Sequence, residues 1–312
     1  MGPQAAATRA GAGRDWSRTR VLLTGATGFI GSHLAGRLDS LGAQVHAVSR
    51  QPPDDGRFWH AADLGDAGAV AELVGSTRPD VVFHLASAVT GARDVGLVLP
   101  TMQANLASVV NLLTAVAGTG TSVVLAGSVE EPRDAEPVPQ SPYAVAKWAA
   151  TGYARMFHRL WGVPVTVLRV AMVYGPAQPD VTKLLPYVTL SLLRGEQPRL
   201  SSGTRLVDWV YVDDVVDAFI LAASTGKAAG QVVDIGSGVQ TSIRNTVELV
   251  ARTVGGDAVP RFGAIGDRPL DNPQLADPGP AAEVLGWRAA TPLDEGVRRT
   301  VAWYAGTLAG QR

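Results

Sequence analysis

The stretch RVLLTGATGFIGSHLAGRLDSLGAQVHAVSR, residues 20–50, determines the fold that we predict for this chain. A short apolar run at residues 21–23 leads into a glycine-rich turn, after which apolar residues recur at helical spacing. Gly42 ends the helical pattern, and a second apolar run follows at residues 45–48. The order of strand, helix and strand indicates a βαβ unit.

The same alternation continues along the chain. Segments typical of buried strands are DVVFHLAS, SVVLAGS, VPVTVLRVAMVYG and QVVDIGSG, and helical segments between them are NLASVVNLLTAVAG, SPYAVAKWAATGYARMFHRLWG and DDVVDAFILAAS. Strands that alternate with helices predict an α/β fold, with a parallel sheet that helices cover on both faces.

The composition changes after Tyr174. The segments YGPAQPDVTKLLP and RFGAIGDRPLDNPQLADPGPAAEVLGW are rich in Pro and Gly and contain few strand signals. We therefore predict a main domain of residues 19–174 and about 207–236, with a smaller lobe of about 175–206 and 237–312. Residues 1–18 are rich in Ala, Gly and Arg, and we expect them to form a disordered tail.

Charge and composition exclude several classes of protein. The 312 residues carry a formal net charge of −1, which offers no bulk attraction to nucleic acid or to an anionic membrane. The chain has no Cys, so disulfides and thiolate metal sites are excluded and the cytoplasm is the expected compartment. The N-terminal region has no apolar stretch long enough for a signal peptide or a membrane span. The five His residues show no metal-ligand spacing, so we expect no metal site.

The glycine-rich turn has features that a dinucleotide site needs. Gly25, Gly28 and Gly31 follow a strand and open a helix in the pattern G-x-x-G-x-x-G. Glycine allows a tight turn and close approach of a pyrophosphate, and the helix N-terminus offers free N–H groups. Close helix packing alone would also explain the glycines, but their place inside a βαβ unit favours dinucleotide binding.

The end of the second strand bears on the choice of cofactor. An acidic residue there would bind the adenosine ribose and favour NAD, whereas this chain has Ser49 and Arg50. A hydroxyl and a guanidinium suit a 2′-phosphate, so we predict NADP(H) in preference to NAD(H). A solvated strand-end Arg is the alternative. Asp63 lies where a third strand would end and can hold the adenine amino group, although an ordinary surface Asp fits equally well.

One of the three Lys residues follows a Tyr by one helical turn. Tyr143 and Lys147 share a helix face, and beside a nicotinamide Tyr143 could exchange a proton with a carbonyl oxygen. We expect the ammonium of Lys147 to lower the pKa of the phenol and to hold the nicotinamide ribose. Ser128, which follows an apolar strand, could donate a hydrogen bond to the same substrate oxygen. A single Tyr-x-x-x-Lys match also arises by chance, but its order after the phosphate turn and the strand-end Ser makes it specific.

These motifs together resemble those of the extended short-chain dehydrogenase/reductase family. The matching segments are TGATGFIG, HLAS, Asn105 in ANLASVVNLL, YAVAK, LRVAMVYGP, WVYVDDVVDAF, DIGSG and LGW, which span residues 21–287. The resemblance implies a Rossmann doubly wound sheet with a smaller C-terminal lobe for a nucleotide-sugar substrate. It also implies that Ser128, Tyr143 and Lys147 form a catalytic triad, and that the protein is a homodimer.

The resemblance extends the expected sites beyond the glycines, Ser49, Arg50 and Asp63. The implied additional cofactor contacts are Thr27, Phe29, Ile30, Leu64, Leu85, Ala86, Ser87, Asn105, Tyr143, Lys147 and Val170. Arg268 matches a diphosphate-binding Arg of the family, and Lys183 and Arg205 are further diphosphate candidates beside Ser128. Three features depart from the family pattern: a short segment between Ser128 and Tyr143, Val207 in place of Arg, and Asp234 in place of Asn.

The residues after Ser128 bear on the reaction. The sequence Ser-Val-Glu-Glu at 128–131 resembles the Ser-Ser-Glu-Glu pattern of reductases acting on nucleotide-activated 4-keto-6-deoxyhexoses. With the predicted use of NADPH, this favours reduction of the 4-keto group of a dTDP- or GDP-linked sugar. Glu130 also matches the position of the dehydratase base, so a redox-neutral epimerase or 4,6-dehydratase is the alternative. A non-catalytic NADP sensor is a second alternative, although sensors typically lose the Tyr–Lys pair that this chain retains.

Overall fold

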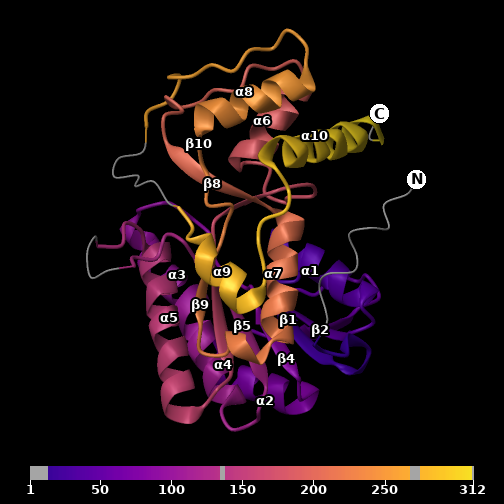
Figure 1. Ribbon diagram of the computed structural model, residues 1–312, viewed down its shortest axis with the longest axis vertical. Helices are drawn as coiled ribbons and strands as arrows, with labels where there is room; N and C mark the ends of the chain where they lie inside the picture. Colours follow the sequence, from indigo (N-terminus) through magenta and orange to yellow (C-terminus); the bar gives the residue numbers. More distant parts are fainter. Residues whose placement is uncertain (1–12, 134–137, 268–274, 311–312) are drawn as a thin grey trace. The chain divides into compact units, whose positions relative to one another are not determined.

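The computed structural model describes residues 13–133, 138–267 and 275–310 (Figure 1). Its contacts divide the chain into two compact units. The first contains the chain through Val170, together with Val216–Asp234 and Gly279–Trp287. The second contains Ala171–Val215, Ile235–Pro278 and the chain from Arg288 onward. The predicted division differs in detail: it returned the chain to the main domain at about residue 207, and it left residues 279–287 in the lobe.

A seven-stranded sheet forms the centre of the first unit. Its strands are β1 (Arg20–Thr24), β2 (Gln44–Ser49), β3 (Phe58–Ala61), β4 (Val81–His84), β5 (Ser122–Ser128), β6 (Val165–Val170) and β9 (Val232–Ile235). They lie in the order β3-β2-β1-β4-β5-β6-β9, and every pairing from β3 through β6 is parallel. The order reverses between β1 and β4, which is where doubly wound sheets bind their ligands. The predicted parallel α/β fold is therefore confirmed.

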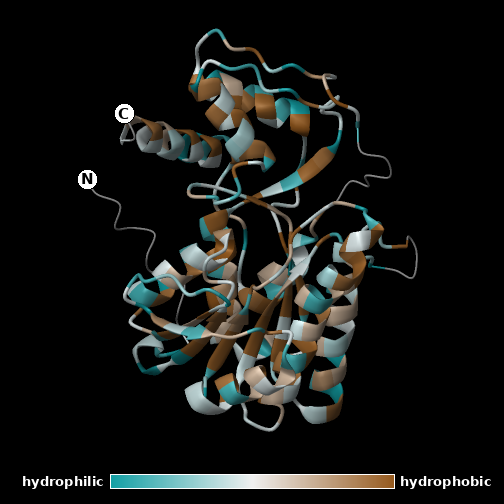
Figure 2. Ribbon diagram, turned by 180° about the vertical axis from the view of Figure 1, so that it is seen from behind, coloured by the Kyte–Doolittle hydropathy of each residue, from teal (hydrophilic) through white to brown (hydrophobic). Residues whose placement is uncertain are grey.

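Helices cover both faces of this sheet (Figure 1). They are η1 (Trp16–Arg18), α1 (Phe29–Ser40), α2 (Ala67–Thr77), η2 (Val95–Leu97), α3 (Val98–Met102), the π-helical η3 (Gln103–Ala107), α4 (Ser108–Val116), α5 (Pro142–Trp161), α7 (Val212–Ser224), η4 (Gly226–Ala228) and α9 (Pro278–Leu285). Leu22, Val82 and Val123 pack with apolar residues of α2, α4 and α5 on one face. On the other face, Phe83 contacts Phe219 of α7. Figure 2 shows hydrophobic residues along the strands between these layers.

Helix α5 has clear start and stop signals. The Ser141 hydroxyl accepts a hydrogen bond from Ala144 N at 3.1 Å, and Pro142 occupies the first helical turn. Gly162 ends the helix in a left-handed conformation, with φ of 66°, which glycine adopts without a steric cost. The 20-residue helix is thus fixed at both ends, with Tyr143 in its first turn and Lys147 one turn later.

Within the residues that the structure describes, the second unit contains a smaller, three-stranded sheet and three helices. Its strands are β7 (Met172–Tyr174), β8 (Leu206–Tyr211) and β10 (Gln240–Ser242), in the order β10-β8-β7. Its helices are α6 (Leu184–Leu193), α8 (Ile243–Val254) and α10 (Leu293–Gly310). Tyr174, Trp209 and Val297 belong to a separate buried core of this unit. The unit is therefore a packed body of its own.

One continuous helical stretch, Val95–Val116, is long and apolar enough to cross a membrane by length and composition. Its second half, however, places Val109, Leu112, Leu113 and Val116 in the buried core beside the sheet. A core helix of a folded domain passes the same test, so its apolar character is weak evidence for a membrane span.

A buried carboxylate joins β9 to β6. The side chain of Asp234 is 2% exposed, and its Oδ1 accepts hydrogen bonds from Nε and Nη2 of Arg169, both at 2.7 Å. Arg133 also pairs with this carboxylate. Asp234, the departure from the family's Asn, is therefore explained by the positive charge on the neighbouring strand.

We predict that Asp234→Asn lowers the free energy of unfolding by about 3 kcal/mol, because Arg169 keeps its charge in a largely buried position. Urea denaturation measures the change. Replacing both partners, as Arg169→Gln with Asp234→Asn, should recover part of the loss. If the double variant were no more stable than Asp234→Asn, the ion pair would not be the source of the effect.

Candidate active site

The glycine-rich turn lies between β1 and α1, and side chains other than hydrogen would not fit there. Gly25 has φ of 73°, and a Cβ at this position would lie 2.6 Å from Ala86 N. A Cβ on Gly31 would lie 2.0 Å from Gly25 O. Gly28 is the N-cap of α1 and supplies no side-chain cap, so the N–H groups of the first helical turn remain available to an anion. Thr27 lies in the turn, and Phe29 and Ile30 begin α1.

The ends of β2 and β3 place the predicted adenosine contacts at the same edge of the sheet. Ser49 ends β2, and its hydroxyl donates to Gln51 O at 3.0 Å. Arg50 follows it with an exposed side chain. Asp63 lies after β3, where its Oδ1 accepts from Gly65 N at 2.9 Å, and Leu64 O accepts from Asn111 Nδ2 at 3.0 Å.

The loop after β4 carries Leu85, Ala86 and Ser87, and Asn105 holds it. The Oδ1 of Asn105 accepts from Ala88 N at 2.7 Å and from the Ser87 hydroxyl at 3.1 Å. Its Nδ2 donates to Ala88 O at 3.0 Å. Because the amide is fully buried and bonded at both ends, Asn105 positions the loop that we predict to line the cofactor site.

A second polar network joins the ends of β1 and β4 to α4. The buried His84 contacts the Thr24 hydroxyl through Nδ1 at 2.9 Å, and its Nε2 lies 3.4 Å from the Ser108 hydroxyl. Burial, with the charge of Lys147 as a smaller cause, lowers the pKa of His84 to about 3. His84 is therefore neutral and structural near neutral pH, as its place in a strand indicates.

The predicted triad is brought together by β5 and α5. Ser128 ends β5, and its neighbour in the sheet is Val170, the last residue of β6. Tyr143 is 9% exposed and forms a side-chain hydrogen bond with Ser128. Lys147 is 4% exposed, and its Nζ donates to Ala126 O at 2.7 Å. Residues distant in the sequence thus form one buried polar site at the carboxyl edge of the sheet.

The protonation of the triad differs from the prediction. Burial raises the pKa of Tyr143, and the carboxylates of Glu130 and Glu131 raise it further, while the hydrogen bond with Ser128 lowers it. Burial lowers the pKa of Lys147 to about 8. We predicted that Lys147 would lower the pKa of the phenol. In the protein without cofactor this prediction is wrong, because the loss of hydration raises the pKa of Tyr143 by more than the other effects lower it.

The two glutamates after Ser128 have different environments. Glu130 donates its backbone N–H to the Ser128 hydroxyl at 3.2 Å, and its charge acts on Tyr143. Glu131 is 3% exposed and bonded through both carboxylate oxygens, to Ser128 N and to the Thr151 hydroxyl, each at 2.7 Å. The sequence prediction named Glu130 but missed Glu131. The only signal for Glu131 was its place in the Glu-Glu pair after the strand-end Ser.

Two of the predicted substrate-binding cations, Lys183 and Arg205, lie in the second unit. Lys183 precedes α6 in the second unit, with its Nζ 3.7 Å from Asp180 Oδ2. Arg205 precedes β8 in the same unit. Arg268 lies outside the described residues. Within the ranges that the structure describes, no group of three or more metal-ligating side chains occurs.

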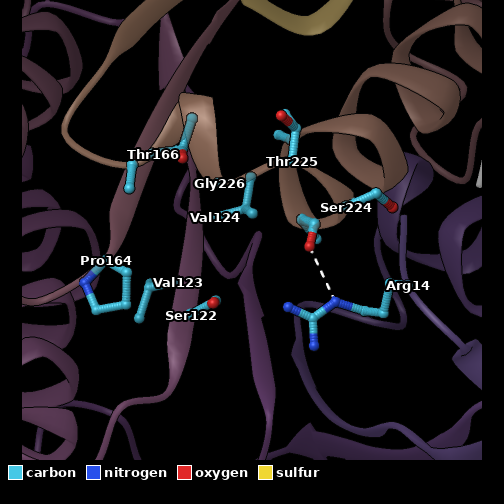
Figure 3. Close-up of a pocket in the computed structure, with 12 residues that line it drawn as sticks. Arg14, Ser122, Val123, Val124, Pro164, Thr166, Ser224, Thr225 and Gly226 are labelled. Carbon is cyan, nitrogen blue, oxygen red and sulfur yellow. Dashed lines mark hydrogen bonds between the residues drawn. The ribbon is translucent and has the colours of Figure 1, made fainter. Parts of the chain in front are cut away.

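A small cavity of about 100 Å³ lies away from the triad (Figure 3). It is lined at the start of β5 and β6 and at the end of α7, whereas Ser128 is at the opposite end of β5. Arg14 points into this region and donates from Nε to Ala223 O at 2.9 Å. That bond satisfies a carbonyl at the C-terminus of α7, so the cavity has a structural explanation.

Comparison with known proteins agrees with this geometry. The model of the NAD dependent epimerase/dehydratase family matches residues 21–236, more than half of the chain. The chain belongs to this family. That family is NAD-dependent, and the members below share both the fold and most of their length with this chain.

Two relatives are similar over nearly their whole length. A UDP-glucose 4-epimerase of Mycolicibacterium smegmatis is 31% identical over 314 residues, covering 91% of this chain and 98% of the relative. A dTDP-glucose 4,6-dehydratase of Streptomyces antibioticus is 30% identical over 316 residues, covering 91% of this chain and 92% of the relative.

Solved structures of the epimerase/dehydratase type also match the fold. The UDP-glucose 4-epimerase of Thermotoga maritima, solved with UDP-glucose, has a TM-score of 0.85 and 29% identity, covering 93% of this chain and 99% of that one. The enzyme WbmF of Bordetella bronchiseptica, solved with NAD⁺ and UDP, has a TM-score of 0.81 and 26% identity, covering 95% of this chain and 94% of that one.

We predict that Gly31→Ala weakens dinucleotide binding about tenfold or more, because the added Cβ would overlap Gly25 O and distort the phosphate turn. Gly36→Ala is the matched control, since it lies in the same helix and its Cβ would meet no atom within 4 Å. Isothermal titration with NAD⁺ measures both. Equal affinity in the two variants would contradict the assigned turn, provided that both retain the wild-type melting temperature.

Proposed function

We propose that this protein converts a nucleotide sugar in a redox-neutral reaction that begins with oxidation at C4. The observation that carries the proposal is the hydrogen bond between Tyr143 and Ser128, beside the buried ammonium of Lys147 and at the strand edge next to the phosphate turn. The named relatives, an epimerase and a dehydratase, both support a redox-neutral reaction over a net reduction.

The glycine turn and the β2 and β4 loops fit a nicotinamide dinucleotide, which supplies a hydride acceptor at the substrate carbon. Once ionised, the Tyr143 phenolate would take the hydroxyl proton as a hydride leaves the same carbon, which turns the alcohol into a ketone. Ser128 would donate a hydrogen bond to that oxygen and hold it near the phenol. Tyr143 lies in the first turn of α5, where the helix dipole stabilises negative charge on the phenolate.

Lys147 supplies the positive charge of this site. Its pKa of about 8 means that the ammonium form predominates at neutral pH and is lost as the pH rises through 8. The bond to Ala126 O fixes Nζ beside the Tyr143 ring, at 5.8 Å from its centroid. Two further donors remain on the ammonium for the nicotinamide ribose.

Two products are compatible with a first oxidation at C4. Return of the hydride to the opposite face of C4, with return of the proton to the oxygen, would give the 4-epimer. Removal of the C5 proton by Glu130 would instead lead to loss of the C6 hydroxyl as water, after which the hydride would return to C6 and a proton to C5. The apolar Val129, which is buried, stands where dehydratases typically place a polar group, so epimerisation is the conclusion that we favour.

The 4-ketoreductase is retained as a second candidate because of Ser49 and Arg50. No acidic residue follows β2 there, and an exposed guanidinium suits a 2′-phosphate. The family is NAD-dependent, which weighs against a preference for NADP(H). The diphosphate of the substrate would be bound by Lys183, Arg205 and Arg268, and the cytoplasm is the compartment that we propose.

We also propose that the protein is a homodimer, formed by the outer faces of α3 and α5. These two helices pack beside each other. Exposed apolar side chains in the part where they meet include Val98, Leu99 and Met102 on α3, and Val145 and Trp148 on α5. A second copy would remove this apolar surface from water, as a two-fold helix–helix interface does.

For the reaction, we expect purified protein with NAD⁺ to convert UDP-glucose or dTDP-glucose to its 4-epimer without net change in reduced cofactor. Tyr143→Phe should lower kcat about 1,000-fold, because the general base is lost. Product analysis by NMR measures this. Glu130→Gln should leave epimerisation within about threefold and should abolish a 4-keto-6-deoxy product if one forms.

Consumption of NADPH with a dTDP- or GDP-linked 4-keto-6-deoxyhexose would instead establish the ketoreductase. Tight cofactor binding without conversion in either assay would favour the sensor.

For the dimer, we expect Leu99→Glu to yield monomers in light scattering, since it places a charge on the proposed apolar interface. Leu99 is 70% exposed in the single chain. Val259→Glu in the second unit is the matched control, because Val259 is similarly exposed but lies outside α3 and α5. An unchanged mass for Leu99→Glu, or a monomeric wild type, would contradict the assigned interface.

A further inference from the structure

Glu131 is a buried carboxylate to which no step of the proposed reaction has yet assigned a role. It connects the two elements that carry the triad. Its Oε1 accepts from the backbone N–H of Ser128 at the end of β5. Its Oε2 accepts from the hydroxyl of Thr151 on α5, one helical turn after Lys147.

The surroundings are shaped to admit this carboxylate. A Cβ on Gly127 would lie 2.7 Å from Glu131 Oε1 and 2.8 Å from Val167 Cγ1, so only glycine leaves room for both neighbours. The backbone of Glu131 is held as well, because its N–H donates to Ser128 O at 3.1 Å. The turn from Ser128 to Glu131 is therefore closed by a backbone bond and a side-chain bond.

Charged and titratable groups face Glu131 from the elements around it. Lys147 and Tyr143 lie on α5, Arg169 lies on β6, and Glu130 precedes Glu131 in the turn. The positive charges of Arg169 and Lys147 stabilise the ionised carboxylate. In turn, its negative charge raises the pKa of both Tyr143 and Lys147.

We propose that Glu131 is a positioning residue that fixes Ser128 opposite Tyr143 by joining β5 to Thr151 of α5, and that its ionisation tunes the triad. The assignment of a catalytic role to the triad rests on the proposed function. The joining role itself rests on the two hydrogen bonds and on burial alone.

Ionisation of Glu131 falls in the working pH range. Burial raises its pKa from 4.5 to about 7, against the lowering effects of Thr151, Ser128 and the two cations. Above pH 7 the carboxylate is charged, which keeps Lys147 protonated and makes Tyr143 harder to ionise. Below pH 7 the carboxyl group of Glu131 is neutral, so it no longer affects the ionisation of Lys147 or Tyr143.

The kinetic test separates charge from shape. Glu131→Gln can accept from Ser128 N and donate to the Thr151 hydroxyl, so it retains the joint without the charge. We expect kcat within about threefold of wild type, with the rising limb of the pH profile shifted to lower pH because Tyr143 ionises more readily. Glu131→Ala should lower kcat about 100-fold with little change in KM, because Ser128 is no longer held.

Thr151 supplies matched variants. Thr151→Val removes the hydroxyl and should lower kcat about tenfold, whereas Thr151→Ser should retain wild-type kcat. Thr166→Val is the control: it removes another buried hydroxyl, which donates to Ala228 O at 2.8 Å at the other end of the sheet. Equal kcat in Thr151→Val and Thr166→Val, together with an unshifted profile for Glu131→Gln, would overturn the proposal.

A second measurement needs no substrate and so separates this proposal from the proposed function. Because the folded pKa of Glu131 is raised, its contribution to stability is complete below about pH 4.5 and is lost as the pH rises to about 7. Between pH 5 and 7, the unfolding constant of wild type should rise about tenfold or more relative to that of Glu131→Gln. A constant ratio across this range would overturn the tuning role even if the protein catalyses another reaction.

Discussion

The hydrogen bond from Lys147 Nζ to Ala126 O is the interaction on which the candidate active site depends. The bond connects the second turn of α5 to β5, because Ala126 lies two residues before Ser128. An ammonium that is 4% exposed needs such a partner, because it has lost nearly all of its water. With Lys147 fixed, the geometry of the helix places Tyr143 one turn earlier, where its phenol meets Ser128. One hydrogen bond between helix and strand therefore fixes the relative positions of the three predicted triad residues.

Burial also sets the electrostatic balance of the site. Two glutamates lie near the phenol, and loss of hydration acts on Tyr143 in the same direction, so the protein's own groups keep the phenol protonated. Lys147 is easier to deprotonate than a free lysine, for the same physical reason. At neutral pH the site thus holds a protonated phenol beside a Lys147 that is mostly in its ammonium form. Such preorganisation lets a small change in local charge have a large effect on proton transfer.

The sequence predicted the parts of the fold that local patterns encode. Apolar runs alternating with helical spacing indicated the parallel sheet, and the glycine spacing indicated the turn before α1. The order of Ser128, Tyr143 and Lys147 indicated the triad, because strand ends and helix starts gather at one edge of such a sheet. Residues 279–287 could not be assigned to the first unit in this way, since their place depends on contacts far apart in the chain.

The sequence did not predict the chemical properties that depend on burial. The ammonium beside a phenol predicted a lowered pKa, but a sequence does not show how much water each group retains. Glu130 was chosen over Glu131 by its alignment with a known pattern, yet Glu131 is the residue that both elements enclose. The amide of Asn105 matched a family position, but only the structure shows that its donors and acceptor are bonded to the loop after β4.

Asp234 shows how a departure from a family pattern can be explained by its neighbours. A neutral Asn at this position would leave Arg169 charged in a largely buried place on the adjacent strand. Aspartate supplies the opposite charge and accepts two of the guanidinium's hydrogen bonds at one oxygen. The substitution in β9 is therefore the counterpart of an arginine in β6. A member of the family with Asn at this position should have an uncharged residue facing it.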